Sequence, residues 1–577
     1  MAIGIDRPAD AFEPELEPRP EGRLDKVVFG VAAALALVVI LWGIVDQASL
    51  GARATEAQSW VIEYTGWLFV LATTGFVVFA IWVAASRYGK IPLGRDGEKP
   101  EFRTASWIAM MFSAGMGIGL MFWGVAEPLT FYLAPPPNTA DAATDEAVQA
   151  AMAQTLFHWT LHPWAIYAVV GLAIGYGTFR LGRPQLISAV FTRILGRRRV
   201  EGPIGKAIDI MAIFATLFGS AASLGLGALQ IGAGLEHNGW VDSVGEVLLV
   251  LIIVTLTILF ILSAVSGVAR GIQWLSNINM VLALVLAAFV FIAGPTLMML
   301  NLLPTAIADY VQYLPQMAGR TDARGGAVAD WLGAWTIFYW AWWVSWTPFV
   351  GMFIARISRG RTIRQFVTGV LLVPSMVSLV WFAIFGGSGI SEADAISGGE
   401  TTVDSNYALF DLLQQYPIPA VTTVVVMLLV GIFFVSGADA ASLVMGTLSQ
   451  RGSIEPKTWL VIFWGALTGA VAAIMLLIAD PDDPVALEGL QALTIVAALP
   501  FLGVMVVLCV SLYRDLRTDP IIVREDLGQS LVEGAVLAGV DRHGEDFALV
   551  VEEAPSDDPT GPVVDSDDPI IDKSAKS

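Results

Sequence analysis

The 577-residue chain has a single cysteine, Cys509, so no disulfide bond can form within it and no multi-thiolate metal site can be built from it. Its four histidines do not fall into a metal-binding spacing such as HExxH, and the phosphate-binding sequence GxxxxGK[ST] is absent. No nucleophile–base motif is visible either. These absences argue against a zinc hydrolase or a nucleotide hydrolase, and we expect neither enzyme activity nor a cofactor.

Charged residues are scarce as well. They make up 15% of the chain, against 56% hydrophobic residues, and the mean hydropathy is +0.68. A soluble domain of this size would have too little polar surface to cover itself. Apolar runs of about 20 residues recur along most of the length, whereas a transmembrane barrel would show shorter alternating segments. We therefore predict an all-α polytopic membrane protein.

The net charge of −20 comes mostly from the two ends of the chain. Residues 1–25 hold seven acidic against three basic residues, and residues 525–577 hold fourteen against three. We expect residues 1–25 and 516–577 to be largely disordered acidic tails around a membrane domain at 26–515. The acidity then says little about a ligand, and no nucleic-acid partner is indicated.

Twelve transmembrane helices are predicted. Basic residues cluster in every second loop, whereas the alternate loops hold only Arg53, Arg320 and Arg324. The positive-inside rule then places both termini in the cytoplasm of a cell whose inner (plasma) membrane holds the protein. The predicted spans are 27–46, 59–85, 104–126, 156–179, 206–235, 245–267, 272–300, 331–356, 363–387, 418–447, 456–479 and 488–513.

Few ionisable side chains fall within these spans: Asp209, Asp439, His158, His162 and, at a span end, Glu127. A buried acid in a membrane is a candidate for function. Asp439 fits equally well as a structural acid bonded to a partner. A chain of acids and histidines along one path, as a proton relay would need, is not visible.

The third span contains "MFSAGMGIGLMFWG", with Gly115, Gly117 and Gly119 at alternate positions. Each glycine costs a helix interior up to about 1 kcal/mol relative to alanine. Gly115 and Gly119 could serve close helix packing, because small residues four apart share a face. Three alternate glycines point around the helix, however, which favours a break in the helix that lines a ligand cavity.

Aromatic residues are concentrated in two other spans. In "FYWAWWVSWTP", Trp343 and Trp346 share a helical face, and Trp342 is expected to point elsewhere and pack. In "HWTLHPWAIY", Trp164 and Tyr167 share a face. Converging rings without a counter-anion are how proteins bind quaternary ammonium groups. The alternative is ordinary packing together with an interfacial aromatic belt.

Trp159 is off the face of Trp164 and Tyr167 in an ideal helix. Pro163 leaves the carbonyl of Trp159 without its helical hydrogen bond, so a distortion there could turn the Trp159 ring toward the others.

Three hydroxyl groups within the spans have either a structural or a ligand-binding interpretation. Thr216 and Ser220, four residues apart, could bond their own helix or bind sodium, and so could Ser436 in another span.

The motifs "AGMGIGLMFWGVAEPLTFY", "HWTLHPWAIY" and "YWAWWVSWTPFVGMFIARISRGRTIRQF" resemble signatures of the betaine/carnitine/choline transporters, over about residues 25–515. The resemblance implies a LeuT-type fold of two leading helices and two inverted five-helix repeats. These repeats would be spans 3–7 (about 104–300) and spans 8–12 (about 331–513). It also implies a homotrimer that imports compatible solutes by alternating access, for osmoprotection, with sodium as the coupling ion.

The resemblance assigns roles to individual residues. Gly119 argues for sodium coupling, because similar proton-coupled choline importers carry aspartate at this position. Gly437 is a departure, since a second hydroxyl commonly follows the residue that matches Ser436. By this resemblance, Trp159, Trp164, Tyr167 and Trp343 form the ammonium box, with Trp346 beside the substrate. The backbone of Gly115, Gly117 and Gly119 faces the carboxylate. Phe338 and Phe353 are gates. One sodium binds Ser113, Met116, Phe433 and Ser436; a second binds Thr216, Ser220 and Phe349.

Two related functions stay open at this point: a sodium-independent exchanger of carnitine-type substrates and a proton-coupled choline importer. The residues do not choose among glycine betaine, choline, carnitine, ectoine and dimethylsulfoniopropionate as the substrate. The acidic tail also differs from the basic helix that ends the osmosensing members, so the resemblance does not extend to that form of regulation.

Overall fold

The computed structural model describes residues 22–115, 117–265, 268–478 and 488–550. Within these residues the chain is helical, and its strand-like pairing is a single bridge between Pro92 and Thr362. The prediction of an all-α polytopic protein is therefore confirmed. In the described part of the chain, eight helices are long and apolar enough to cross a membrane, and a bent pair, if it is one span, raises the number to nine.

These eight helices coincide with predicted spans. Their starts are set by local capping as well as by hydropathy: α2 begins at Gln47 rather than at 59, because the Asp46 carboxylate accepts a hydrogen bond from the Ser49 amide. The eight are α1 (Lys26–Val45), α2 (Gln47–Ala85), α9 (Pro203–His237), α10 (Glu246–Val265), α15 (Ile363–Ser391), α18 (Pro419–Ser449), α19 (Thr458–Leu477) and α20 (Glu488–Leu516).

The other four predicted spans coincide with shorter, broken or irregular helices. The third is α3 (Thr104–Gly115) followed by α4 (Ile118–Leu133), and the fourth is α5 (Asp145–Trp159) followed by α6 (Leu161–Gly175). The seventh is α11 (Val268–Ala293). The eighth comprises α13 (Gly326–Leu332), a π-helical turn at Gly333–Ile337 and α14 (Phe338–Ile357). Each of the twelve ranges thus contains helix.

One long helix was not predicted. The seventh span was expected to reach residue 300, but α11 ends at Ala293, and α12 (Thr296–Ala318) leaves it at an angle of 109°. The turn falls at Gly294 and Pro295, and Pro295 cannot extend α11. Short elements fill the remaining connections: Arg87–Lys90, Tyr176–Arg180, Ser188–Phe191, α7 (Thr192–Leu195), α8 (Arg197–Val200), Asp322–Arg324, α16 (Ala393–Ser397) and α17 (Ala408–Gln414).

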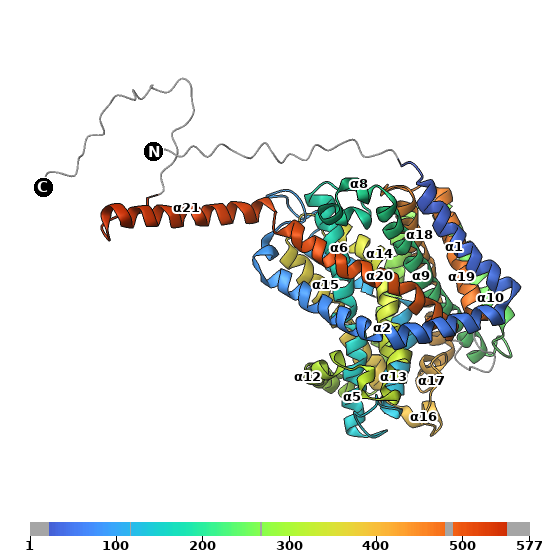
Figure 1. The fold of residues 1–577 in the computed structure, drawn as a ribbon. Helices are drawn as coiled ribbons and strands as arrows, with labels where there is room; N and C mark the ends of the chain where they lie inside the picture. The colour runs from blue at the N-terminus through green and yellow to red at the C-terminus, as the bar shows by residue number, and fades with distance from the viewer. Residues whose placement is uncertain (1–21, 116, 266–267, 479–487, 551–577) are drawn as a thin grey trace. The chain divides into compact units, whose positions relative to one another are not determined.

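Among the described helices, α14 and α6 share the most extensive contact, and α14 also packs on α9 and α20 (Figure 1). Two glycines allow the central pair to approach closely. A Cβ at Gly171 of α6 would lie 3.2 Å from the carbonyl oxygen of Gly351 in α14, and a Cβ at Gly351 would lie 3.1 Å from the Gly171 nitrogen. In contrast, α1 and α10 expose large apolar side chains such as Ile44 and Leu262, which suits a lipid-facing position.

The loops predicted to lie on one side of the membrane do meet. Arg359, after α14, bonds Glu98, which lies between α2 and α3, at 2.7 Å. Asp25, before α1, is 3.5 Å from Lys206 and 3.4 Å from Arg451. These contacts agree with the predicted alternation of basic and non-basic loops. Which side is cytoplasmic stays a prediction.

Residues 518–577 form a separate unit. Its described part holds one helix, α21 (Pro520–His543), inside a region that was expected to be largely disordered. Local signals explain the helix: Asp519 caps it by accepting a hydrogen bond from the Ile521 amide, and Pro520 occupies the first helical position. Residues 1–21 and 551–577 of the predicted tails lie outside the described residues.

Candidate substrate-binding site

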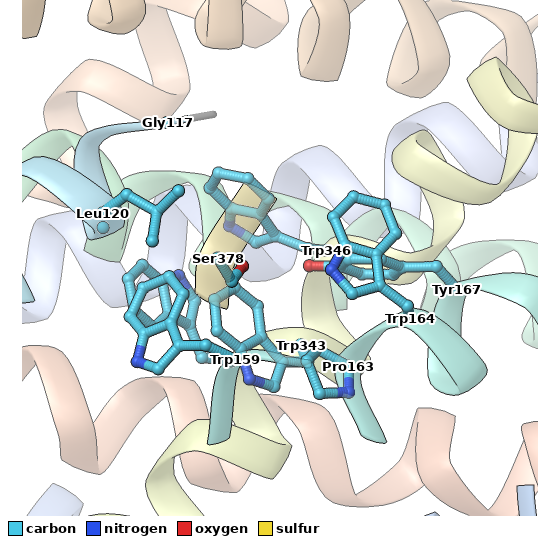
Figure 2. Close-up of a pocket in the computed structure, with 11 residues that line it drawn as sticks. Gly117, Leu120, Trp159, Pro163, Trp164, Tyr167, Trp343, Trp346 and Ser378 are labelled. Carbon is cyan, nitrogen blue, oxygen red and sulfur yellow. The ribbon is translucent and has the colours of Figure 1, made fainter. Parts of the chain in front are cut away.

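A pocket opens where α4, α6 and α14 meet at the break between α3 and α4 (Figure 2). Its walls come from residues far apart in the sequence, and Figure 2 shows Trp164 and Tyr167 on one side with Trp159 and Leu120 on the other. The lining residues are Gly117, Gly119, Leu120, Trp159, Pro163, Trp164, Tyr167, Trp342, Trp343, Trp346 and Ser378. The five aromatic residues predicted to bind the substrate are therefore brought together.

The aromatic rings meet mostly edge to face. Trp343 lies at the centre of the cluster: its ring centroid is 4.9 Å from that of Trp159, at 76°, and 6.2 Å from that of Tyr167, at 82°. Trp164 and Tyr167 are 5.4 Å apart at 78°, and Trp346 is 6.4 Å from Trp343 at 86°. Perpendicular rings form corners, and a compact cation in such a corner meets several π faces at once.

Most indole N–H groups of the cluster are bonded to the protein. Trp343 Nε1 donates to the His158 carbonyl at 3.0 Å, and Trp346 Nε1 donates to the Gly219 carbonyl at 2.9 Å. Trp159 Nε1 donates to Glu127 at 2.6 Å. Because these donors are already satisfied, the rings offer their faces to a ligand rather than their N–H groups.

The predicted distortion of the fourth span is present. α5 ends at Trp159, and Thr160 leaves the helical region with φ −118° and ψ −111° before α6 begins at Leu161. The break lies three residues before Pro163. It carries the Trp159 ring to the rings of α14 and confirms that Trp159 does not follow an ideal helical face.

The predicted break at the glycines is confirmed too. α3 ends at Gly115 and α4 begins at Ile118, and Gly117 is extended, with φ −161° and ψ −178°. Gly117 and Gly119 line the pocket. A Cβ at Gly119 would lie 2.7 Å from Trp159 and 2.8 Å from Trp342, so two rings close on this glycine. Gly117 has room, since the nearest atom to a Cβ would be in Trp346, at 4.0 Å.

Four lining residues were not predicted. Trp342, expected to pack away from the site, stacks on Trp343 with centroids 4.8 Å apart and planes at 12°, and so forms part of the wall. Adjacent helical residues normally diverge, which is why periodicity misplaced it. Leu120 and Pro163 sit beside predicted residues and could have been inferred from them. Ser378 comes from α15, and no sequence signal pointed to it.

The predicted gates do not line the pocket. Phe338 is buried and stacks behind the wall on Trp342, with centroids 5.8 Å apart and planes at 13°. Phe353, farther along α14, is 40% exposed. Both lie on the helix that carries the central tryptophans, and their gating role stays a prediction.

The residues of the second predicted sodium site are close to the pocket. α9 carries Thr216 and Ser220, and it is tied to α14 by the bond between Trp346 and Gly219. Thr216 Oγ1 donates to its own helix, at Ala212, whereas the Ser220 hydroxyl is buried without a hydrogen-bond partner in the described part of the chain. Phe349 packs on Trp346 with ring centroids 5.1 Å apart. An unsatisfied buried hydroxyl is what a cation site would leave.

The first predicted sodium site is described only in part. Met116 and the side chain of Ser113 lie outside the described residues. Ser436 Oγ donates to its own helix, to the carbonyls of Ile432 at 2.9 Å and Phe433 at 3.2 Å. Gly437 has no side chain, so this position supplies no side-chain oxygen, although a Cβ there would meet nothing within 4 Å. Among the described residues no cluster of three His, Cys, Asp or Glu side chains could hold a metal ion.

The other ionisable candidates lie apart from the pocket lining. Asp209 accepts hydrogen bonds from Ser188, from the amide at 3.0 Å and the hydroxyl at 2.8 Å, and is a structural acid. Asp439 accepts one from Ser263 at 3.1 Å through one carboxylate oxygen. His162 stacks on Trp340 with ring centroids 5.2 Å apart. Glu127 and His158 belong to a buried network behind Trp159.

A helical membrane protein with broken spans around a ring-walled pocket has the architecture of a secondary transporter. Comparison with known proteins gives the family. The sequence model of the betaine/carnitine/choline family transporters (BCCT) matches residues 27–521, and the chain belongs to this family. It is a multi-span membrane transporter and not an enzyme.

Three relatives of this chain carry related names. The chain is 43% identical to the betaine/ectoine transporter LcoP of Corynebacterium glutamicum, over 94% of this chain and 86% of that protein. It is 43% identical to the glycine betaine transporter OpuD of Bacillus subtilis, over 85% and 94%. For glycine betaine transporter 1 of Vibrio parahaemolyticus the identity is 38%, over 85% and 94%. A compatible-solute transporter is the class that these relatives define.

Proposed function

We propose that this protein imports betaine-like quaternary ammonium or related zwitterionic compatible solutes by sodium symport and alternating access. The observation that carries the proposal is the convergence of Trp159, Trp164, Tyr167 and Trp343 on one pocket. A quaternary nitrogen has no N–H to donate, so it is bound more strongly by the faces of aromatic rings than by hydrogen-bond acceptors. The names of the relatives, which include betaine, ectoine and glycine betaine, agree with this chemistry.

The other end of a zwitterion fits the broken span. α4 begins at Ile118 directly after the extended Gly117, and no side chain caps it. The first amides of a helix lack intrahelical partners and carry partial positive charge, which favours a carboxylate. Gly117, Gly119 and Leu120 line the pocket at this helix start. We therefore propose that the ammonium group lies among the rings and the carboxylate lies at the start of α4.

Sodium coupling is proposed on two grounds. The Ser220 hydroxyl is buried and unpartnered beside the helix that carries the tryptophans, and Gly119 leaves no carboxylate for a proton in the substrate pocket. Bound sodium that stabilises α9 against α14 would favour substrate binding, and substrate would favour sodium to the same degree. The proposal also includes a homotrimer in the inner membrane with both termini in the cytoplasm.

Uptake by proteoliposomes tests this function. Purified protein is reconstituted, and uptake of labelled glycine betaine is measured with an inward sodium gradient and with potassium in place of sodium. We expect accumulation only with the sodium gradient. Uptake that is the same in potassium and needs internal substrate would favour the carnitine-type exchanger, whereas uptake driven by a pH gradient alone would favour the proton-coupled importer.

The exchanger is retained as a second candidate because of α18. There the Ser436 hydroxyl is bonded to its own helix, and Gly437 supplies no further side-chain oxygen.

Competition by choline, carnitine, ectoine and dimethylsulfoniopropionate in the same uptake assay would rank the substrates.

A further inference from the structure

A buried polar network lies directly behind the Trp159 wall of the pocket. Glu127, in α4, is fully buried and accepts three hydrogen bonds. They come from Trp159 Nε1 at 2.6 Å, from the Tyr339 hydroxyl at 2.5 Å and from His158 Nδ1 at 2.7 Å. Of these residues only Trp159 lines the pocket, so Glu127 touches the site through one indole edge.

The chain of partners fixes where the protons are. Arg320 can only donate, so the Gln154 atom that it bonds at 3.0 Å is the amide oxygen. The Gln154 amide nitrogen is then the atom 3.0 Å from His158 Nε2, and that ring nitrogen must accept. The hydroxyl of Thr336 is also 3.0 Å from it. His158 therefore carries its proton on Nδ1 and donates it to Glu127.

Glu127 is thus surrounded by donors. Three N–H or O–H groups point at its two oxygens, and this arrangement suits a carboxylate, which only accepts hydrogen bonds. His158, neutral in this arrangement, gives it a hydrogen bond rather than an ion pair, and among the described residues no lysine or arginine contacts Glu127. The guanidinium of Arg320 is three hydrogen bonds away from Glu127, through Gln154 and His158. These three donors favour the ionised form, which would put a negative charge one indole ring from the pocket.

We propose that Glu127 is a positioning and specificity-determining residue that acts through Trp159. The inference rests on the proposed function and deepens it. The carboxylate accepts the hydrogen bond of the indole N–H and so fixes the orientation of the ring. Hydrogen-bonded groups in a low-dielectric interior polarise one another, so this bond shifts electron density into the ring and makes its face more negative. The pocket then selects a cationic head group over a neutral group of the same shape without any acid in the pocket itself.

A purely structural role predicts a different behaviour. Glu127 also ties α4 to α5 and α14 through its three hydrogen bonds. If that were all, neutralising it would weaken every ligand to the same degree. If it acts through the ring, only ligands with a positive head group lose affinity.

The test uses two ligands of one shape. Glycine betaine is compared with 3,3-dimethylbutanoate, in which carbon replaces the quaternary nitrogen, by competition against labelled betaine on the full-length purified protein. For Glu127→Gln we expect betaine affinity to fall about tenfold and affinity for the carbon analogue to stay within about twofold. An equal fall for both ligands, or no change for either, overturns the proposal.

A double-mutant cycle needs betaine alone. Trp159→Phe keeps a ring but removes the N–H that reaches Glu127, so Glu127→Gln should cost about tenfold with Trp159 and about twofold or less with Phe at that position. The same loss in both backgrounds contradicts the proposal. The matched substitution Asp209→Asn, at a buried acid that accepts hydrogen bonds from Ser188, should leave the betaine affinity unchanged.

If the Glu127→Gln variant does not fold, substitutions of the two tryptophans test the proposal without it. Trp159→Phe should reduce the preference for betaine over the carbon analogue more than Trp164→Phe does, because the described residues give Trp164 Nε1 no carboxylate partner. Equal reductions overturn the proposal. Wild-type protein that does not bind betaine at all would instead refute the proposed function, so the two failures are distinguishable.

Discussion

At the scale of single residues, the binding properties of the pocket depend on which polar atoms of its aromatic rings are already hydrogen-bonded to the protein. The Trp343 N–H donates a hydrogen bond to the His158 carbonyl, and the Trp346 N–H donates one to the Gly219 carbonyl. Their faces are what remains for a ligand. Specificity for a methylated cation therefore depends on ring identity and placement, and individual substitutions should separate these two contributions.

Trp343→Leu removes the ring that contacts Trp159, Trp342 and Tyr167. Losing a desolvated cation–π face of about 2 kcal/mol should weaken betaine binding about thirtyfold or more. Binding is measured by tryptophan fluorescence or by competition with labelled betaine. Trp60→Leu, at a ring 54% exposed on α2, is the control and should bind as the wild type does. Unchanged uptake kinetics in Trp343→Leu would show that these rings do not form the ammonium-binding site.

Gly119→Ala should abolish high-affinity binding. The added methyl would lie 2.7 Å from Trp159 and 2.8 Å from Trp342, so both rings would have to move. Gly117→Ala is the matched control, because its nearest contact would be at 4.0 Å. Affinity is measured on both purified variants. Equal losses would mean that steric closure on the rings is not the reason for glycine at position 119.

Ser220→Ala tests the proposed sodium ligand. The unpartnered hydroxyl is removed, so the sodium concentration that gives half-maximal uptake should rise several-fold, while betaine affinity at saturating sodium changes little. Ser375→Ala, whose hydroxyl bonds its own helix at Leu371, serves as the control. An unchanged sodium dependence of uptake would count against this residue as a ligand.

At the scale of elements, the site exists because two spans are interrupted. The break between α3 and α4 exposes the start of α4, and the break at Thr160 turns Trp159 toward α14. Both breaks could be anticipated from local residues, the alternate glycines and Pro163, because glycine and proline change what a helix can do within one or two turns.

Other elements could not be anticipated in this way. The direction of α12 depends on a turn at Gly294 and Pro295 in an otherwise apolar run, and hydropathy does not register a change of direction. Trp342 joined the pocket through tertiary stacking on Trp343, which overrides helical periodicity. Ser378 arrives from α15, and a single sequence has no signal for such a long-range neighbour.

The approach of α6 to α14 should depend on Gly171. Gly171→Val would place bulk against the Gly351 carbonyl, 3.2 Å from the Cβ position, and force apart the helices that carry Trp164 and Trp343. Overpacking of this kind costs about 1–3 kcal/mol, so the melting temperature should fall and betaine binding should weaken. Gly75→Val, with nothing within 4 Å, is the matched control. Equal melting temperatures in the two variants would contradict the packing argument.

At the scale of the whole molecule, the membership of the betaine/carnitine/choline transporter family and the geometry of the pocket agree on the class of solute. The network from Arg320 through Gln154, His158 and Glu127 also joins the pocket to the loop region beyond α12. The predicted inverted repeats and trimer stay predictions, since they concern symmetry and assembly rather than contacts within the described chain.

A structure of the protein with glycine betaine and sodium tests the central claim most directly. We expect the trimethylammonium group among Trp159, Trp164, Tyr167 and Trp343, and the carboxylate against the amides at the start of α4. Betaine bound outside this pocket, or bound in it with its carboxylate against the rings, would contradict the account.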